Sequence, residues 1–364
     1  MRIAQVAPLN EAVPPKLYGG TERVVSYLTE ELVAQGHEVT LFASADSRSS
    51  ARLVPCSAKA LRLDTTCEDR LIHHILQLEE VMAAAAQFDI IHFHTDYIHY
   101  PWARRASVPV VNTLHGRQNI RDLAALYREF DDIALVSISN SQRRPIPNAR
   151  WAGTVYHGLP KDLLRPTLTP GSYLAFLGRF SHEKRFDRAV EIARRTGLTL
   201  KVAAKADPAE GCYFDQVVRP LLDDPLVDWI GEIGESGKAA FLGGALAHLF
   251  PIDWPEPFGV VMIEAMACGT PTIAWSCGSV PEVLENAVTG FIVSSIDEAV
   301  EAVEACVSFD RAGCRAAFER RFTATRMAAD YVAVYRRLGA VKRPPLRVCE
   351  PPTNWAGGGR IDNA

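Results

Sequence analysis

Short apolar runs alternate with longer amphipathic segments along the first half of the chain. After an apolar run at residues 3–7, apolar side chains recur with helical spacing over residues 24–32. This spacing predicts a helix that Thr21 caps at its N-terminus and that Gly36 ends as a C′ glycine. A strand, a helix and a second strand in this order imply a right-handed crossover and a parallel sheet. Further apolar runs of strand length lie at residues 37–43, 89–94, 108–113 and 134–138.

The same alternation begins again after a stretch rich in proline and glycine at residues 158–171. Two successive series of this kind predict an α/β protein with two doubly wound, Rossmann-like domains, at residues 1–165 and 166–322. A helix at residues 324–338 is expected to pack back on the first domain, and residues 343–364 are expected to form a flexible tail. In the second series we expect a helix at residues 185–196 and strands at 173–177, 198–203, 228–230, 248–250, 271–275 and 290–293.

Composition excludes several classes of partner. Of the 364 residues, 48% are hydrophobic and 23% are charged, and the net charge is −4. Because the basic excess typical of nucleic-acid-binding proteins is missing, we expect no nucleic-acid partner. The eight cysteines contain no C-x-x-C pair, which argues against a zinc site. No apolar run is long enough to span a bilayer, and the mildly basic residues 48–62 predict no amphipathic helix with a basic face. We therefore expect a cytoplasmic protein that does not associate with membranes.

The densest chemistry lies between residues 254 and 271. Residues 259–268 predict a helix that Gly269 ends, and every residue of this helix except Glu264 is apolar or small. A helix of this kind is buried, and a lone buried carboxylate costs several kcal/mol unless it is hydrogen-bonded. The pattern fits an acid that caps an internal loop, and it equally fits an acid that binds the two hydroxyls of a ribose.

A second acid, Glu256, precedes this helix in a loop between two prolines. It lies beside backbone N–H groups at the start of the helix, those of Phe258, Gly259 and Val260, which are ready donors for an anion or a hydroxyl. Two acids at this spacing favour a binding site over a purely structural role.

Charged residues also follow the strand expected at residues 173–177. Arg179 can bind phosphate oxygens with its planar guanidinium group, and Lys184 adds a mobile charge at the start of the next helix. Ligands of a doubly wound sheet collect at the carboxyl ends of its strands, where both residues lie. A solvated basic turn is the alternative for either residue alone. Together with Glu256 and Glu264, they provide an anion site and a sugar site for a nucleotide-diphosphate sugar.

These motifs resemble those of the retaining family 4 glycosyltransferases, which have the two-domain B-type fold (GT-B). The second domain of that family carries G-R-x-x-x-x-K followed by E-x7-E, which stand here at residues 178–184 and 256–264. The resemblance extends to about residue 338 and implies two domains that face each other across a cleft. It implies that Glu264 binds the ribose, Glu256 the transferred hexose, and Arg179 and Lys184 the diphosphate.

The resemblance also assigns roles in the first domain. Gly19 and Gly20 resemble the glycine loop that approaches the donor phosphate, and His115 resembles the histidine in the cleft. His94 and Asp96 follow a strand and are candidates for the acceptor side. The implied catalytic residues are Glu256, Arg179, Lys184 and His115. The implied donor site contains Gly19, Gly20, Arg179, Lys184, Glu256, Phe258, Gly259, Val260, Glu264, Gly278 and Ser279, the last two as a second phosphate loop.

Family membership implies transfer of a hexose with retention of configuration, without a metal or another cofactor. No D-x-D pair stands near the proposed site, in keeping with this. The donor expected from the frequency of donors in the family is UDP-glucose, and the acceptor is expected to be a small molecule. The chain departs from many relatives at Arg185, where they have glycine, and at Lys205, where they have a loop that contains glycine. A nucleotide-sugar epimerase and a catalytically silent nucleotide-sugar-binding protein are the alternative functions.

Overall fold

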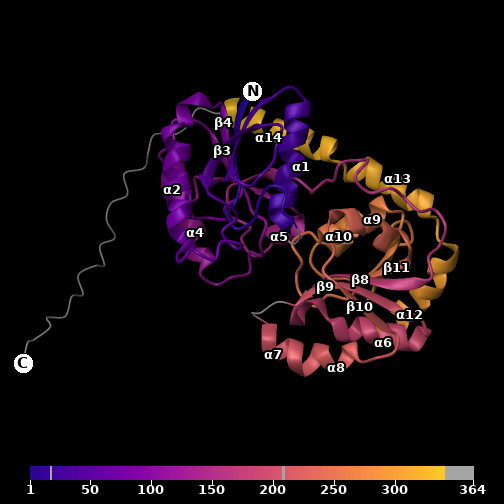
Figure 1. Cartoon of the computed structure of the whole chain (residues 1–364). Helices are drawn as coiled ribbons and strands as arrows, with labels where there is room; N and C mark the ends of the chain where they lie inside the picture. The colour runs from indigo at the N-terminus through magenta and orange to yellow at the C-terminus, as the bar shows by residue number, and fades with distance from the viewer. Residues whose placement is uncertain (17–18, 207–209, 341–364) are drawn as a thin grey trace, which may run out of the picture.

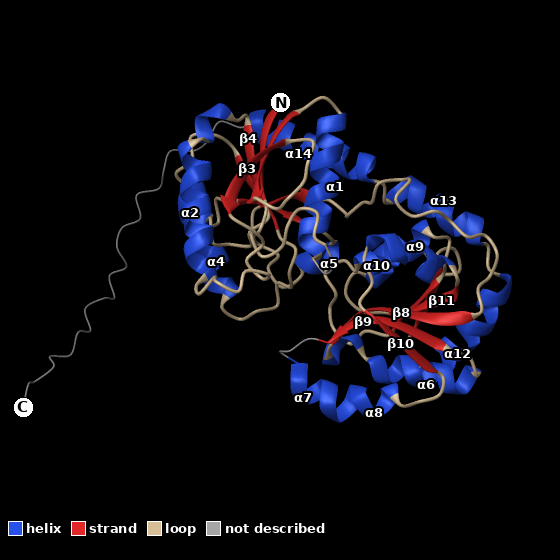
Figure 2. Ribbon diagram, in the orientation of Figure 1, coloured by secondary structure: helices blue, strands red, loops and turns tan. Residues whose placement is uncertain are grey.

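The protein is described by a computed structural model that covers residues 1–16, 19–206 and 210–340. It contains two α/β units, each built on its own parallel sheet (Figure 1, Figure 2). The two-domain, Rossmann-like fold predicted from the sequence is therefore confirmed. The tail predicted at residues 343–364 lies outside the described residues.

The first sheet has seven strands in the order β3-β2-β1-β4-β5-β6-β7, and every pairing is parallel. The strands are β1 (Arg2–Val6), β2 (Glu38–Ser44), β3 (Arg52–Ser57), β4 (Ile90–Phe93), β5 (Val110–Thr113), β6 (Ala134–Ser137) and β7 (Trp151–Thr154). The accompanying helices are α1 (Gly20–Ala34), α2 (Arg70–Ala83), α3 (Tyr100–Ala103), α4 (Leu123–Glu129) and α5 (Asn140–Arg143). The order of the strands reverses between β1 and β4, and such a switch point is where ligands bind in open α/β sheets.

The second sheet has six parallel strands in the order β10-β9-β8-β11-β12-β13. They are β8 (Tyr173–Phe180), β9 (Leu200–Ala206), β10 (Val227–Gly231), β11 (Ala245–Phe250), β12 (Thr272–Trp275) and β13 (Gly290–Val293). The helices are α6 (Phe186–Thr196), α7 (Gly211–Tyr213), α8 (Arg219–Leu222), α9 (Glu235–Gly243), α10 (Val260–Ala267), α11 (Val280–Val283), α12 (Ile296–Ala305) and α13 (Arg311–Arg321). Its switch point lies between β8 and β11, the two strands that precede the charged residues singled out from the sequence.

The chain crosses between the two units twice, and the two crossings lie side by side. The Leu159 N–H donates to the Phe322 carbonyl at 2.9 Å, and the Ala324 N–H donates to the Leu159 carbonyl at 2.8 Å. The last helix, α14 (Ala324–Ala340), then packs against α1 and β7 of the first domain. Figure 1 shows this return in yellow. One cluster of buried apolar side chains continues from α1 and α14 into α10, so the two domains share part of their core.

The C-terminal ends of α1 and α10 were predicted correctly from the sequence, whereas the N-terminal cap of α1 was not. Gly36 has a φ of 82° and follows α1 as the C′ glycine, and Gly269 has a φ of 73° after α10. The capping prediction for Thr21 was wrong, because the N-cap residue of α1 is Gly19, two residues earlier. With no side chain at the N-cap, the first N–H groups of α1 are open to a ligand. Strands β3 and β7 were not predicted, and neither were helices α2, α3, α4, α5, α7, α8, α9, α12 and α13.

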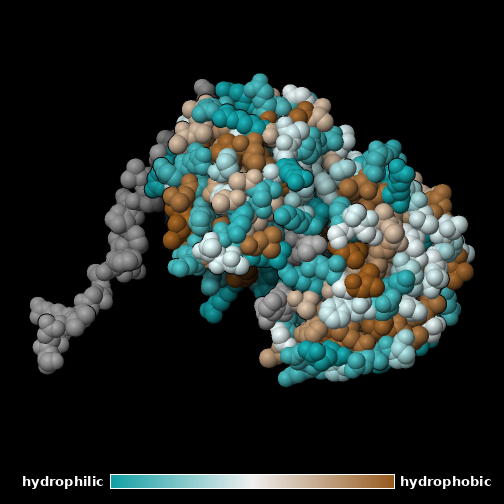
Figure 3. Space-filling model, viewed as in Figure 1, coloured by the Kyte–Doolittle hydropathy of each residue, from teal (hydrophilic) through white to brown (hydrophobic). Residues whose placement is uncertain are grey.

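Helix α2 has an apolar outer face, over which hydrophobic side chains gather in Figure 3. Leu71, Ile72, Ile75 and Leu76 are between 41% and 60% exposed, whereas the opposite side of the helix is buried. Within the residues that the structure describes, no helix combines the length and apolar character that a membrane crossing requires.

Candidate active site

The charged residues predicted for the donor lie where α10 begins, on the side of the second domain that faces α1 and α5 (Figure 1). Among the described residues, polar contacts join α1 to α9 and α5 to α11 across the cleft. The guanidinium group of Arg23 on α1 forms an ion pair with Glu235 on α9. The Glu282 carboxylate on α11 accepts from the N–H groups of Asn140 and Ser141 at 2.7 and 2.6 Å, at the start of α5. These contacts hold the two domains close to each other.

Glu264 is buried, with 2% of its surface exposed, as the apolar pattern of its helix predicted. The protein supplies its partner, since the Lys238 ammonium group on α9 donates to Glu264 Oε1 at 2.6 Å. Lys238 Nζ also lies 3.5 Å from Glu235, which connects Glu264 to Arg23 of the first domain. The Glu264 side chain is thereby paired with an opposite charge where it lies buried in α10.

Glu256 and Lys184 meet directly. The Lys184 ammonium group forms an ion pair with Glu256 Oε2, and the indole N–H of Trp254 donates to the same oxygen at 3.1 Å. The ammonium group also lies 5.2 Å from the centre of the Phe250 ring and 5.4 Å from that of Trp254. An ammonium over aromatic faces is attracted to them and is held in place. The structure thus brings together one residue predicted for the hexose and one predicted for the diphosphate.

The turn at Gly278 and Ser279 packs against the same loop. Gly278 has a φ of 60°, and a Cβ atom there would overlap with the backbone of Glu256, so glycine is required for this approach. The Ser279 N–H donates to the Glu256 carbonyl at 3.0 Å, and Ser279 Oγ donates to the Phe258 carbonyl at 2.9 Å. Ser279 is buried and fixes the loop ahead of α10.

The start of α10 has free donors. Gly259, with a φ of 74°, is the N-cap residue and carries no capping side chain. In the described part of the chain, no acceptor is bonded to the N–H groups of Phe258 or Gly259. These groups and the N–H of Val260 are the first donors of the helix, where anions and hydroxyls bind favourably.

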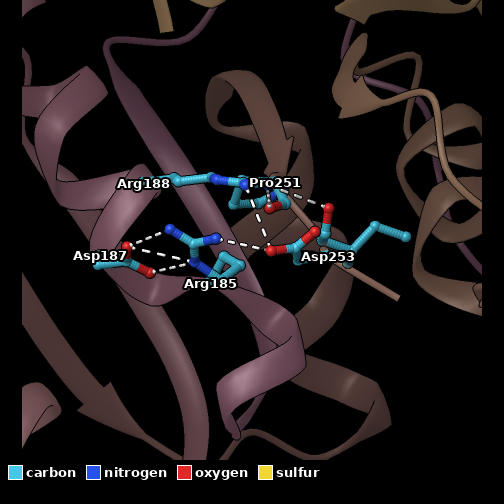
Figure 4. A network of polar contacts seen from close by, with 6 residues as sticks. Arg185, Asp187, Arg188, Pro251 and Asp253 are labelled. Atoms are coloured by element: carbon cyan, nitrogen blue, oxygen red, sulfur yellow. Dashed lines mark hydrogen bonds and ion pairs between the residues drawn. The ribbon is translucent and has the colours of Figure 1, made fainter. Parts of the chain in front are cut away.

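Arg179 is the last residue but one of β8, and its guanidinium group donates to Glu183 at 2.6 Å. Its side chain is partly exposed. The position after Lys184 explains why many relatives have glycine there, because Arg185 adopts a left-handed φ of 51°. Arg185 is secured by Asp187 and Asp253, at 2.8 Å each, as Figure 4 shows. Lys205 lies near the end of β9, paired in register with Arg179 on β8.

In the first domain, Gly19 and Gly20 lie at the start of α1. Gly19 has a φ of 149°, and a Cβ atom there would come within 2.7 Å of Pro15. A Cβ atom at Gly20 would meet no heavy atom within 4 Å, so the backbone is open to a ligand on that side.

His94, Asp96 and His115 line one hollow of about 460 Å³ at the carboxyl ends of β4 and β5. Asp96 has a left-handed φ of 48°, and its carbonyl accepts from the Asn112 amide at 2.5 Å. Asp96 is exposed where it lines the hollow, and the protein packed around it raises the pKa of its carboxyl group by desolvation. Ligand sites of this size are common in enzymes.

A row of buried histidines leads from this hollow to the second domain. His94 Nε2 donates to Gln5 Oε1 at 2.8 Å, so His94 Nδ1 is unprotonated and accepts from His115 Nε2 at 2.9 Å. The His115 ring stacks on His157 with centroids 5.4 Å apart, and His157 meets the edge of Phe258 at 4.8 Å. Burial lowers the pKa of His115 to about 3, so the ring is neutral near pH 7.

Several residues of this site were not predicted. Gln5 is the polar interruption of the first apolar run, and that interruption was a readable signal. His157 lies two residues before Leu159, where the chain first crosses between the domains, and no sequence motif singled it out. Lys238 and Glu235 belong to α9, a helix that the sequence pattern did not predict. Among the described residues, no group of three or more histidine, cysteine, aspartate and glutamate side chains is arranged to hold a metal ion.

Comparisons with known proteins agree with the architecture. Residues 18–152 match the family model described as Glycosyltransferase Family 4, and residues 168–310 match the model described as Glycosyl transferases group 1. The chain is 25% identical over 342 residues to glycogen synthase of Mycobacterium tuberculosis, with 76% of this chain and 79% of the relative covered.

Solved structures show the same fold. AviGT4, a glycosyltransferase involved in avilamycin A biosynthesis, superposes with a TM-score of 0.71 at 23% identity, over 93% of this chain and 98% of its own. Anabaena HepE in complex with UDP-glucose superposes with a TM-score of 0.72 at 15% identity, over 93% of this chain and 100% of its own. With both halves matched in order and the GT-B arrangement of its two sheets, the chain belongs to the family 4 glycosyltransferases and is a glycosyltransferase.

Proposed function

We propose that this glycosyltransferase transfers a hexose from a nucleotide-diphosphate sugar, UDP-glucose, to a small-molecule acceptor with retention of configuration. The observation that carries the proposal is the meeting of Lys184 and Glu256 beside the open N-terminus of α10, with Glu264 buried in the same helix. The solved Anabaena HepE structure with UDP-glucose supports the choice of donor.

The donor spans the cleft in this proposal. The ribose hydroxyls bind Glu264, which the ion pair with Lys238 holds in place. The diphosphate binds Arg179, Lys184 and the N–H groups of Gly19 and Gly20. The start of α1, which has no capping side chain, favours an anion there. The hexose hydroxyls bind Glu256, and the N–H groups of Phe258, Gly259 and Val260 complete the site together with the turn at Gly278 and Ser279.

Breaking the anomeric bond places negative charge on the leaving diphosphate and positive charge on the sugar ring. Arg179 and Lys184 stabilise the first charge, and the Glu256 carboxylate stabilises the second. Lys184 is already held by Glu256 and two aromatic rings, so little reorganisation precedes the reaction. The acceptor hydroxyl attacks from the face that the diphosphate leaves, and the departing phosphate takes its proton. His115, neutral and hydrogen-bonded to His94, orients hydroxyl groups at the reacting carbon. No metal is required in this scheme, since the cationic side chains and helix N-termini carry the counter-charge.

Calorimetric titration in the presence of a chelator tests the donor assignment. The purified protein is titrated with UDP, GDP and ADP and with their glucose derivatives. We expect UDP and UDP-glucose to bind, and we expect both Arg179→Ala and Glu264→Ala to abolish binding with the fold retained. Arg194→Ala is the matched control, since Arg194 pairs with Asp224 at 2.7 Å on the far end of α6. Unchanged donor affinity in Glu264→Ala would contradict the assignment of Glu264 to the ribose.

The same samples separate the alternatives. Appearance of a different sugar nucleotide without any acceptor would indicate an epimerase. Tight donor binding with no transfer to any acceptor and no hydrolysis would indicate a silent binding protein. Binding of none of the nucleotides would remove the proposed donor site altogether.

A further inference from the structure

The hollow at the ends of β4 and β5 has walls whose charges restrict the acceptor. It opens between the carboxyl ends of β1, β4 and β5 and the start of α1. Its two carboxyl groups come from Glu22 on α1 and Asp96 after β4, and its other titratable groups among the described residues are the Tyr97 phenol and the imidazoles of His74, His94 and His115. Within the described residues that line it, there is no lysine and no arginine.

The histidines of the hollow do not supply positive charge near pH 7. Burial lowers the pKa of His74 and His115 and places that of His94 well below its usual value. Asp96 is exposed, and the protein packed around it raises the pKa of its carboxyl group. The Glu22 carboxyl group is buried, and desolvation brings its pKa to about 7. Glu22 therefore changes between a hydrogen-bond donor and an ionised acceptor close to neutral pH.

Two cations close to Glu22 already have partners. Arg62 forms an ion pair with Glu11, and it also feels the charges of Glu22 and the second domain's Glu232. Arg23, one residue after Glu22, pairs with Glu235 across the cleft. An anion in the hollow would meet Glu22 and Asp96 with no counter-charge available from these side chains.

On the basis of the proposed function, we infer that the acceptor is a compound without phosphate or carboxylate groups that presents hydroxyl or N–H donors to Glu22 and Asp96. Burying an anion between two carboxyl groups costs several kcal/mol through like-charge repulsion and desolvation. A hydroxyl or N–H group instead satisfies the carboxyl oxygens. The polar side chains of Asn10, Thr21 and Thr95 in the same wall bind further hydroxyl groups.

Matched pairs of acceptors test this inference. Glycerol, glucose and myo-inositol are each offered beside glycerol 3-phosphate, glucose 6-phosphate and inositol 1-phosphate, with the sugar nucleotide that binds in calorimetry. Transfer of labelled hexose is measured at pH 7. We expect transfer to at least one uncharged member, with kcat/KM at least about tenfold above its phosphate ester. Equal or faster transfer to a phosphate ester overturns the inference, and so does donor hydrolysis without transfer to any uncharged member.

Charge-neutral variants show whether the two carboxyl groups cause the discrimination. Glu22→Gln together with Asp96→Asn is expected to reduce the ratio between uncharged and phosphorylated acceptors by about tenfold. Asp297→Asn, which removes an exposed carboxylate of α12, is the control and should leave the ratio unchanged. An unchanged ratio in the double variant counts against the inference. Donor affinity by calorimetry is read in parallel: its absence in the wild-type protein refutes the proposed function, whereas normal donor binding with preference for phosphate esters refutes only this inference.

Discussion

At the scale of single residues, the pair formed by Glu264 and Lys238 joins stability to binding. Both side chains are buried, with 2% and 11% exposed, and their charged atoms are 2.6 Å apart. Removing one partner of a buried pair leaves the other charge uncompensated, which typically costs about 3–5 kcal/mol. Replacing both partners by apolar side chains of similar volume is often neutral.

This asymmetry lets fold and function be measured separately. We expect Glu264→Leu to lower the free energy of unfolding by about 3 kcal/mol, and Lys238→Met combined with Glu264→Leu to recover most of that loss. We expect neither variant to bind UDP-glucose, because both lack the carboxylate proposed for the ribose. Urea unfolding and calorimetry are the two measurements. A stable double variant that still binds the nucleotide would contradict the role of Glu264.

The two residues also differ in how far the sequence could predict them. Glu264 is visible because it interrupts an apolar helix, and its burial follows from that pattern. Lys238 stands 26 residues away in α9, whose sequence has two glycines near its end and only a weak apolar face. A partner chosen by three-dimensional packing leaves no periodic trace in the chain.

At the scale of elements, strand ends were predicted better than helix starts. Apolar runs predicted every strand of both sheets except β3 and β7, the two edge strands of the first sheet, whose side chains are half-buried or exposed. The start of α6 shows why helix starts are harder to predict. Three residues, His182–Lys184, form a 3-10 turn, and Arg185 then takes a left-handed conformation before the helix begins. The cost of that conformation is offset by ion pairs with Asp187 and Asp253, which depend on the fold (Figure 4).

Two substitutions at Arg185 separate backbone strain from ion pairing. A left-handed backbone costs a non-glycine residue roughly 1 kcal/mol, and partly exposed ion pairs contribute up to about 1 kcal/mol each. Arg185→Ala loses the pairs and keeps the strain, whereas Arg185→Gly loses the pairs and relieves it. We expect the glycine variant to be more stable than the alanine variant by about 1 kcal/mol in urea unfolding. Equal stability of the two variants would show that the turn relaxes.

At the scale of the whole molecule, the site depends on contacts between the domains that no local pattern encodes. The Tyr331 and Tyr335 hydroxyl groups, on the returning helix α14, lie 3.0 Å from Thr113 Oγ1 and 2.7 Å from His92 Nδ1, below the hollow. The histidine row continues from there to Phe258 in the second domain. The sequence indicated His94 because it follows a strand, and it indicated His115 through the family resemblance at the end of another strand. Tyr331, Tyr335 and His157 are brought to the row only by the double crossing of the chain.

Burial of so many imidazoles makes the stability of the folded protein sensitive to acid. The histidines whose pKa values burial lowers most are His92, His94, His99, His115, His157 and His248. The unfolded chain binds protons at these groups below about pH 6.5, and the folded chain does not. Their stabilising effect is therefore complete above pH 6.5 and is lost as the pH falls. For a folded pKa of about 3, as for His99, the loss between pH 7 and pH 5 is roughly 2 kcal/mol.

Glu22 changes the pH dependence of the free energy of unfolding in the opposite direction, so the size of its contribution must be compared with that of the histidines. Its folded pKa of about 7 exceeds the unfolded value of 4.5, so its protonation stabilises the fold as the pH falls from 7 to 5, by roughly 2 kcal/mol. This offsets about one histidine of six. We therefore expect the free energy of unfolding to decrease steeply between pH 7 and pH 5.

In His99→Phe the decrease should be about 2 kcal/mol smaller, because one titrating group is gone while the stacking on Phe93, with centroids 4.0 Å apart, is kept. Tyr100→Phe alters packing on the same ring without removing a group that titrates in this range, and it should keep the full pH dependence. If His99→Phe and Tyr100→Phe respond to pH alike, the acid sensitivity arises elsewhere in the fold.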